Sequence, residues 1–292
     1  MIGLAIGLAL AAAALHGTWN VLVKVSGDPL ATFQRATIFA ALVVTPITLV
    51  AWLIAGRPGL APAAAWLAAI SAALELAYLW LLSTAYRRGE LSVVYPIARG
   101  SAPLLAVAAG IGVLGERLAP AQLVGVALLL AGILAVTLPQ TSGRATVPAL
   151  LTGVSIAAYT AVDRIGVRLS PPWLYGWFLI VLLAGGLAIS TWASAKLAAR
   201  RRSAAVVEEV TGERPQLTWR QAAVIGVFMW SGYLLVLVAL SIAPLSVVAP
   251  VRETAVVAVA VWGVWKLRER KGAALKLLGA SATLVGVALL AL

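Results

Sequence analysis

Apolar runs of about 20 residues follow one another along the sequence, each long enough as a helix to cross a hydrocarbon core about 30 Å thick. Short breaks at Gly, Pro and charged residues separate the runs. The runs are rich in Ala, Leu and Val and lack the alternation typical of membrane β-barrel strands. Hydrophobic residues make up 62% of the chain and charged residues 11%, which leaves too little polar surface for a soluble domain. The sequence therefore predicts an all-α membrane protein.

The breaks predict ten transmembrane helices. The first run is interpreted as a spanning helix and not as a signal peptide, because it lacks the basic segment that begins a signal peptide. The predicted spans are 2–24, 31–55, 62–86, 91–114, 120–138, 146–168, 173–196, 219–241, 246–266 and 273–292.

Lys and Arg gather in the odd-numbered loops between these spans, most densely in the loop at about 197–217. Basic loops remain in the cytoplasm during membrane insertion. The pattern predicts a multi-pass protein of the bacterial inner (plasma) membrane with both termini on the non-cytoplasmic side. The net charge of +12 is explained by these loops, so we expect no nucleic-acid partner.

Two stretches of the chain nearly repeat each other: LSVVYPIARG at 91–100 and LSVVAPVRET at 245–254. They begin 154 residues apart, and the same separation relates Gly125 to Gly279. The offset predicts two five-helix repeats, residues 1–140 and residues 145–292. Because five is odd, the second repeat must enter the membrane inverted relative to the first.

Inverted repeats around a central cavity are the architecture of alternating-access transporters, in which the substrate site lies near mid-membrane between the halves. An inert duplicated bundle is the alternative. Arg99 and Arg252 would approach the bilayer middle from opposite faces, where a charged side chain needs a partner or a watery cavity. Snorkelling, or a structural pair with Glu75 or Glu253, is the other interpretation of these arginines.

Pro96 and Pro250 lie a few residues before these arginines, each in the first turns of its predicted span. Proline removes a backbone donor and bends a helix. We interpret both as hinges used when the halves move, and a static kink is the alternative.

Several motifs carry a resemblance to a known family: HGTWNVLVK near the first span, LGERLAPAQLVGVALLLAGILAV at the end of the first half, and LRERKGAALKLLGASATLVGVALL at the end of the second. With them the sequence resembles the drug/metabolite transporter superfamily, in its ten-helix EamA-type branch, and is similar to bacterial aromatic amino-acid exporters. The resemblance implies a central cavity lined by the first, third, fourth, sixth, eighth and ninth helices. The fifth and tenth helices would pack at the periphery.

Polar and aromatic side chains at mid-span on these helices form the predicted substrate site. Charges of both signs suit a zwitterion, since Arg binds a carboxylate and Glu an ammonium group, and aromatic faces suit a ring or planar cation. For the tyrosines, packing between helices is an equal alternative. The predicted residues are His16, Trp19, Asn20, Glu75, Tyr78, Tyr95, Arg99, Tyr159, Trp230, Tyr233, Arg252 and Glu253.

The predicted function is an alternating-access carrier that exports small metabolites, foremost aromatic or other neutral amino acids and planar amphiphilic compounds. A sugar-phosphate or nucleotide-sugar exchanger and a channel-like facilitator are the alternatives. The expected partners are the small-molecule substrate and the lipid bilayer. Protons are a third if buried Glu75 couples transport to a proton gradient, although facilitated exit needs no such group.

An enzyme is not expected, because neither an HExxH nor a G-x-S-x-G motif is present. The chain has one His and no Cys. We therefore predict neither a metal site nor a cofactor.

Overall fold

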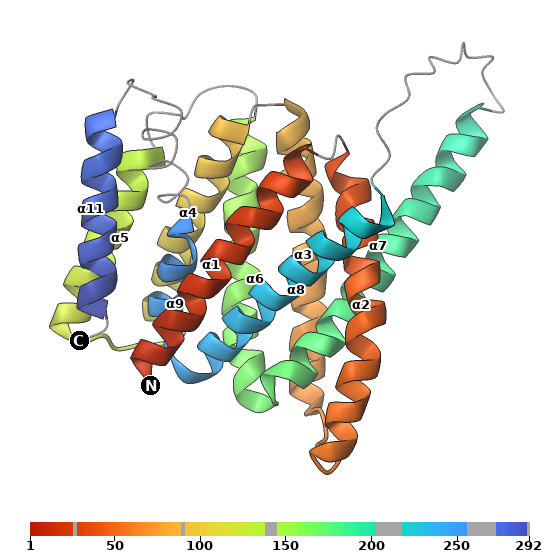
Figure 1. Ribbon diagram of the computed structural model, residues 1–292, viewed down its shortest axis with the longest axis horizontal. Helices are drawn as coiled ribbons and strands as arrows, with labels where there is room; N and C mark the ends of the chain where they lie inside the picture. The colour runs from red at the N-terminus through yellow and green to blue at the C-terminus, as the bar shows by residue number, and fades with distance from the viewer. Residues whose placement is uncertain (26–27, 89–90, 138–144, 203–217, 256–272, 291–292) are drawn as a thin grey trace.

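The computed structural model describes residues 1–25, 28–88, 91–137, 145–202, 218–255 and 273–290 (Figure 1). In these ranges the chain forms ten α-helices and no strand. The helices are α1 (Ile2–Val25), α2 (Pro29–Ile54), α3 (Pro62–Arg88), α4 (Leu91–Gly112), α5 (Pro120–Thr137), α6 (Thr146–Leu169), α7 (Pro172–Arg202), α8 (Trp219–Ile242), α9 (Leu245–Arg252) and α11 (Ala273–Leu290). Nine of the predicted spans overlap one of these helices over most of their length, whereas the ninth overlaps α9 only at 246–252 and is followed by a turn at 253–254. Of the ninth predicted span, residues 256–266 lie outside the described part of the chain.

The all-helical prediction is confirmed for the described residues. Six of their helices, α1, α2, α3, α6, α7 and α8, are long and apolar enough to cross a membrane, and shorter apolar helical segments occur in α4, α5 and α11. Large apolar side chains such as Leu42, Ile54 and Leu278 lie on the outside of the bundle, 68%, 81% and 68% exposed. Lipid tails are the solvent in which such a surface is stable. Ten membrane crossings remain a prediction.

Proline and capping residues fix where several helices begin. Helices α2, α3, α5 and α7 each start with proline, which is tolerated in the first turn because the backbone donors there have no partner within the helix. Asp28 caps α2 by accepting a hydrogen bond from the Ala31 backbone nitrogen at 3.3 Å. Thr218 and Gln221 form a reciprocal capping box at the start of α8.

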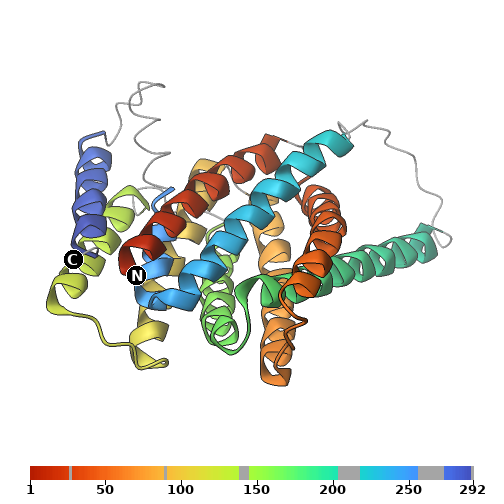
Figure 2. The same ribbon diagram turned by 60° about the horizontal axis from the view of Figure 1, so that its bottom comes forward.

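The helices form three groups across the molecule (Figures 1 and 2). Helices α5 and α11 pack together at one end, and α2 packs against α7 towards the other. Between them α3 packs on α6, α1 on α8, and α4 on both α6 and α9. This middle group is where the predicted site residues lie.

The contacts between helices come in matching sets. If α1 to α5 correspond in order to α6, α7, α8, α9 and α11, then the α3–α6 contact corresponds to α8–α1, and α2–α8 to α7–α3. In Figure 1, α1 rises from the labelled N-terminus whereas α6 descends, and α5 and α11 run in opposite directions. Two inverted five-helix repeats would require these relations.

Glycines allow α5 and α11 to approach closely. A Cβ atom added to Gly125 would lie 2.8 Å from the Gly286 carbonyl oxygen, and one added to Gly132 would overlap the Gly279 carbonyl and the Thr283 side chain. Small residues are the usual means of close helix contact in membranes. These glycines therefore permit the close packing of α5 against α11.

Candidate functional site

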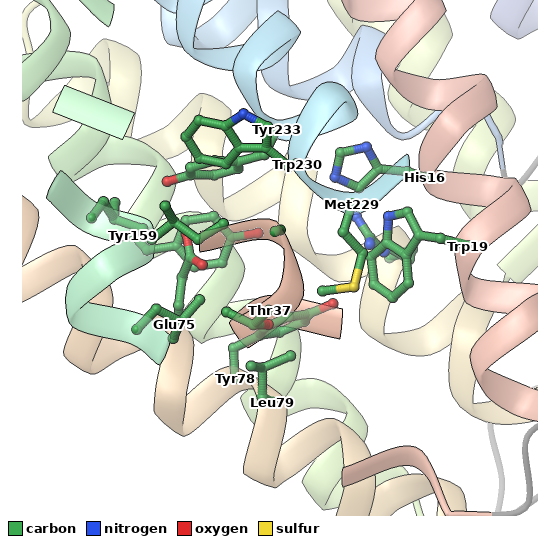
Figure 3. A pocket seen from close by; sticks show the side chains of 15 residues that line it. His16, Trp19, Thr37, Glu75, Tyr78, Leu79, Tyr159, Met229, Trp230 and Tyr233 are labelled. Carbon is green, nitrogen blue, oxygen red and sulfur yellow. The ribbon is translucent and has the colours of Figure 1, made fainter. Parts of the chain in front are cut away.

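A cavity of about 60 Å³ lies inside the middle group of helices and α2 and α7 (Figure 3). Eight of the twelve predicted site residues line it, and they come from both halves of the chain. The lining residues are His16, Trp19, Thr37, Ala40, Glu75, Tyr78, Leu79, Arg99, Tyr159, Leu179, Ile180, Leu183, Met229, Trp230 and Tyr233.

Three other predicted residues are buried but do not line the cavity: Asn20, Arg252 and Glu253. Asn20 lies behind the cavity wall, where its side-chain nitrogen donates to the His16 carbonyl at 2.8 Å and its oxygen accepts from the Tyr86 hydroxyl at 3.4 Å. The side chains of Tyr95 and Pro96 lie outside the described part of the structure.

Helices α2 and α7 contribute lining residues that were not predicted. Thr37 and Ala40 come from α2, and Leu179, Ile180 and Leu183 come from α7. The family resemblance implied a cavity without these two helices. Apart from Thr37, these side chains are apolar. The sequence does not indicate that they line a cavity, because similar residues fill every span.

Arg99, Arg252 and Glu253 form a buried triad that joins α4 to the end of α9. Arg99 Nη1 lies 3.1 Å from Glu253 Oε1 and 3.2 Å from Oε2, and Arg252 Nε lies 3.0 Å from Oε1. Arg252 also donates to Thr160 Oγ1 of α6 at 3.4 Å. The triad residues are only 2–3% exposed. The structure thus shows the Arg99–Glu253 pair that the sequence offered as an alternative, while Arg99 also lines the cavity.

Pro250 lies inside α9, two residues before Arg252. The helix ends at Arg252, and Glu253 adopts the C-cap position with its backbone nitrogen bonded to the carbonyls of Pro250 and Val251. The proposed hinge at Pro250 and two members of the triad, Arg252 and Glu253, therefore lie in one short segment.

Asp163 of α6 is held by hydroxyl groups from three other helices. Its carboxylate accepts from Ser71 of α3 at 2.6 Å, from Tyr175 of α7 at 2.9 Å and from Tyr233 of α8 at 2.6 Å. Hydrogen bonds to an ionised acceptor are stronger than neutral ones. Three of them allow a carboxylate that is 1% exposed to remain without a cationic partner.

Glu75 of α3 is the other buried carboxyl group of this region, 9% exposed. Its Oε1 atom has no hydrogen-bond partner. The same holds for Trp19 Nε1, Thr37 Oγ1 and the Tyr78 hydroxyl, and all four side chains line the cavity. Four of the six such atoms among the described residues therefore belong to cavity-lining side chains, and the other two are Ser83 Oγ and Thr146 Oγ1.

Aromatic rings supply much of the cavity wall. Tyr78 and Tyr159 pack edge to face, with ring centroids 5.9 Å apart, and Trp230 lies 6.4 Å from Tyr233. Figure 3 shows Glu75, Tyr159 and Tyr233 on one side of the cavity, opposite His16 and Trp19. Trp80, also at mid-span, is 60% exposed and points away from this site.

A second ion pair, the α9 cap pair of Arg164 and Glu116, lies outside the cavity. Glu116 Oε1 is 3.5 Å from Arg164 Nε. The Glu116 carboxylate also accepts from the backbone nitrogens of Leu245 and Ser246, at 2.7 and 2.9 Å, and so caps the first turn of α9. No group of three or more His, Asp or Glu side chains suited to a metal ion occurs among the described residues.

Residues 3–138 match the model of the EamA-like transporter family, which confirms the EamA-type resemblance. The similarity to aromatic amino-acid exporters stays a prediction. A solved crystal structure whose description names no activity superposes with a TM-score of 0.69 at 17% sequence identity, over 99% of this chain and 98% of that chain. At this identity the likeness shows a shared fold. No curated protein matches the sequence.

Proposed function

We propose that this chain, whose residues 3–138 match the EamA-like transporter family, is a membrane carrier that moves small metabolites through the central cavity. The family match supports a membrane transporter of small molecules. The observation that supports the cavity as the site is its lining. Charged and aromatic side chains from both halves of the chain meet there.

Alternating access by two inverted repeats is the proposed mechanism. The matching helix contacts and the opposite directions of α1 and α6 (Figure 1) support it. The Arg99–Glu253 contact joins α4 to the end of α9, and these two helices correspond in the two halves. A relative movement of the halves would act on this contact and on Pro250 beside it.

Aromatic or other neutral amino acids are the proposed substrates, together with planar amphiphilic compounds. The cavity offers a carboxyl group at Glu75, a guanidinium group at Arg99 and several aromatic rings, which are the groups that a zwitterion with an apolar side chain would bind. A sugar phosphate would need more positive charge than the cavity supplies, because Arg99 already contacts Glu253.

A bacterial inner-membrane location and a non-cytoplasmic position of both termini remain part of this proposal. In Figure 1 the chain begins and ends at the same end of the bundle, which an even number of crossings requires. The excess of Lys and Arg in the odd-numbered loops gives the direction.

Transport into liposomes tests the proposed function. Purified protein should take up phenylalanine, tyrosine or tryptophan with saturation, and internal unlabelled substrate should stimulate the uptake. Repeating the panel with and without a pH gradient determines whether protons are a partner. Single-channel conductance without saturation would favour a channel-like facilitator, and uptake equal to that of empty liposomes for the whole panel would contradict the proposal.

The matched variants are Arg99→Ala in the cavity and Arg57→Ala in the α2–α3 connection, where Arg57 is exposed. Arg99→Ala should lower uptake while the protein still inserts in the membrane. Arg57→Ala should transport as the unmodified protein does. Equal transport by both variants would remove Arg99 from the site.

A further inference from the structure

The four unpartnered polar atoms of the cavity differ in what they can bind. Trp19 Nε1 can only donate a hydrogen bond, and the hydroxyl groups of Thr37 and Tyr78 can donate or accept. Glu75 Oε1, when ionised, can only accept. A buried polar atom without a partner costs about 1–3 kcal/mol, and more when it is charged. The Glu75 carboxylate is therefore the group in this cavity with most to gain from a ligand.

The buried charges near the cavity balance only if one carboxyl group is protonated or a cation is bound. Apart from the α9 cap pair, the buried charged side chains of the described residues are Arg99, Arg252, Glu253, Asp163 and Glu75. Fully ionised, they carry three negative charges and two positive ones. Glu253 contacts both arginines, and Asp163 is held by three hydroxyl groups. When Glu75 is ionised, no ion pair among the described residues compensates its negative charge.

The surroundings of Glu75 suit a positively charged nitrogen. Tyr159 and Tyr233 lie on the same side of the cavity as Glu75, and Trp230 lies next to Tyr233 (Figure 3). The face of an aromatic ring attracts a cation, most strongly when water is excluded. A carboxyl group and aromatic rings on the same side of the cavity can offer both attractions to one ligand.

We propose that Glu75, Tyr159, Trp230 and Tyr233 form a subsite for a singly charged ammonium group. This inference rests on the proposed use of the cavity for a substrate and narrows its chemistry. The ligand must carry a positively charged nitrogen, as an amine or an amino acid does. An anion without such a nitrogen is excluded, because it would bring a further negative charge to Glu75.

Three probes that share one phenyl ring separate the contributions: 2-phenylethylamine has only the ammonium group, 3-phenylpropionate only the carboxylate, and phenylalanine both. Their binding to the detergent-purified protein is measured by scintillation proximity with radiolabelled 2-phenylethylamine and unlabelled competitors. The amine and phenylalanine should compete. The affinity for 3-phenylpropionate should be at least about tenfold weaker, the lower end of the range for a hydrogen bond to a charged group.

Glu75→Gln should weaken binding of 2-phenylethylamine at least about tenfold. The matched control is Asp28→Asn, which changes a carboxyl to an amide outside the cavity at a helix cap where Asn serves equally well. It should leave the affinity unchanged. Glu75→Asp keeps the carboxyl group, so this variant should still bind the amine more tightly than 3-phenylpropionate. It tests the subsite even if Glu75→Gln fails to fold.

Equal affinity for the amine and 3-phenylpropionate, unchanged amine binding in Glu75→Gln, or no binding of any probe would each overturn the subsite. The binding assay needs no transport, so the two proposals fail separately. Amine-selective binding without flux into liposomes would contradict the carrier and keep the subsite. Saturable flux that does not depend on Glu75 would keep the carrier and contradict the subsite.

Discussion

Replacing Glu253 by Gln tests whether one carboxylate stabilises both buried arginines. The Glu253 carboxylate contacts both arginines, Arg99 at 3.1 Å and Arg252 at 3.0 Å. Glu253→Gln removes this negative charge, while the two guanidinium groups, which are 3% and 2% exposed, keep their positive charges. Removing one partner of a buried ion pair costs about 3–5 kcal/mol. We expect Glu253→Gln to lose stability by about this amount.

Removing one arginine should have a smaller effect. Arg99→Met leaves Arg252 and Glu253 as a neutral pair, with Nε and Oε1 3.0 Å apart. Its cost should be about 1.5–3 kcal/mol, the contribution of a hydrogen bond to a charged group. In the Glu253→Gln background the same substitution removes a buried positive charge that has lost its contact with Glu253. There Arg99→Met should increase stability, so its effect changes sign.

The assay is denaturant unfolding in mixed micelles, followed by tryptophan fluorescence, for both single variants and the double variant. The double-mutant cycle isolates the interaction between the two positions. Arg57→Met, in both backgrounds, controls for a general effect of removing an arginine. The reasoning is refuted if Arg99→Met destabilises the protein equally with and without Glu253.

Three further predictions concern packing, hydrogen bonding and topology. Gly132→Ala should destabilise the protein, because the new Cβ overlaps α11, whereas Gly7→Ala meets no atom within 4 Å and should be neutral or stabilising; thermal unfolding in detergent compares the two. Tyr175→Phe removes one of three donors to Asp163 and should cost about 1.5–3 kcal/mol in denaturant unfolding; an unchanged stability would mean that this hydroxyl does not hold the carboxylate. A reporter enzyme that is active only outside the cytoplasm should be active when fused after Leu292. Activity of a reporter that functions only in the cytoplasm would contradict the predicted orientation.

The helices could be predicted from the sequence because length and composition determine them. An apolar run that is long enough to span a bilayer satisfies its backbone only as a helix, and proline then marks where the helix starts, as at Pro62 and Pro172. The sequence also offered Glu253, along with Glu75, as an alternative partner for the arginines. The two residues in contact, Arg99 and Glu253, are separated by the repeat offset of 154.

The faces of the helices could not be predicted. Asp163 accepts hydrogen bonds from Ser71, Tyr175 and Tyr233, and the spacing of these residues along the chain does not reveal that four helices meet there. Leu183 of α7 lines the cavity although it looks like any other leucine in an apolar run. Such contacts depend on how the helices rotate and cross, which an apolar pattern on all sides does not specify.

Thiol labelling of the cavity tests most directly whether substrate passes through it. The chain contains no cysteine, so Thr37→Cys introduces a single thiol at a lining position whose hydroxyl has no partner. The carrier account predicts that a membrane-impermeant thiol reagent reaches this cysteine in both right-side-out and inside-out vesicles, and that phenylalanine slows the labelling. Val113→Cys, at a position that is 82% exposed and outside the cavity, should label at the same rate with and without phenylalanine. The account would be contradicted if Thr37→Cys were labelled from one side only or from neither side, and if phenylalanine did not change the labelling rate.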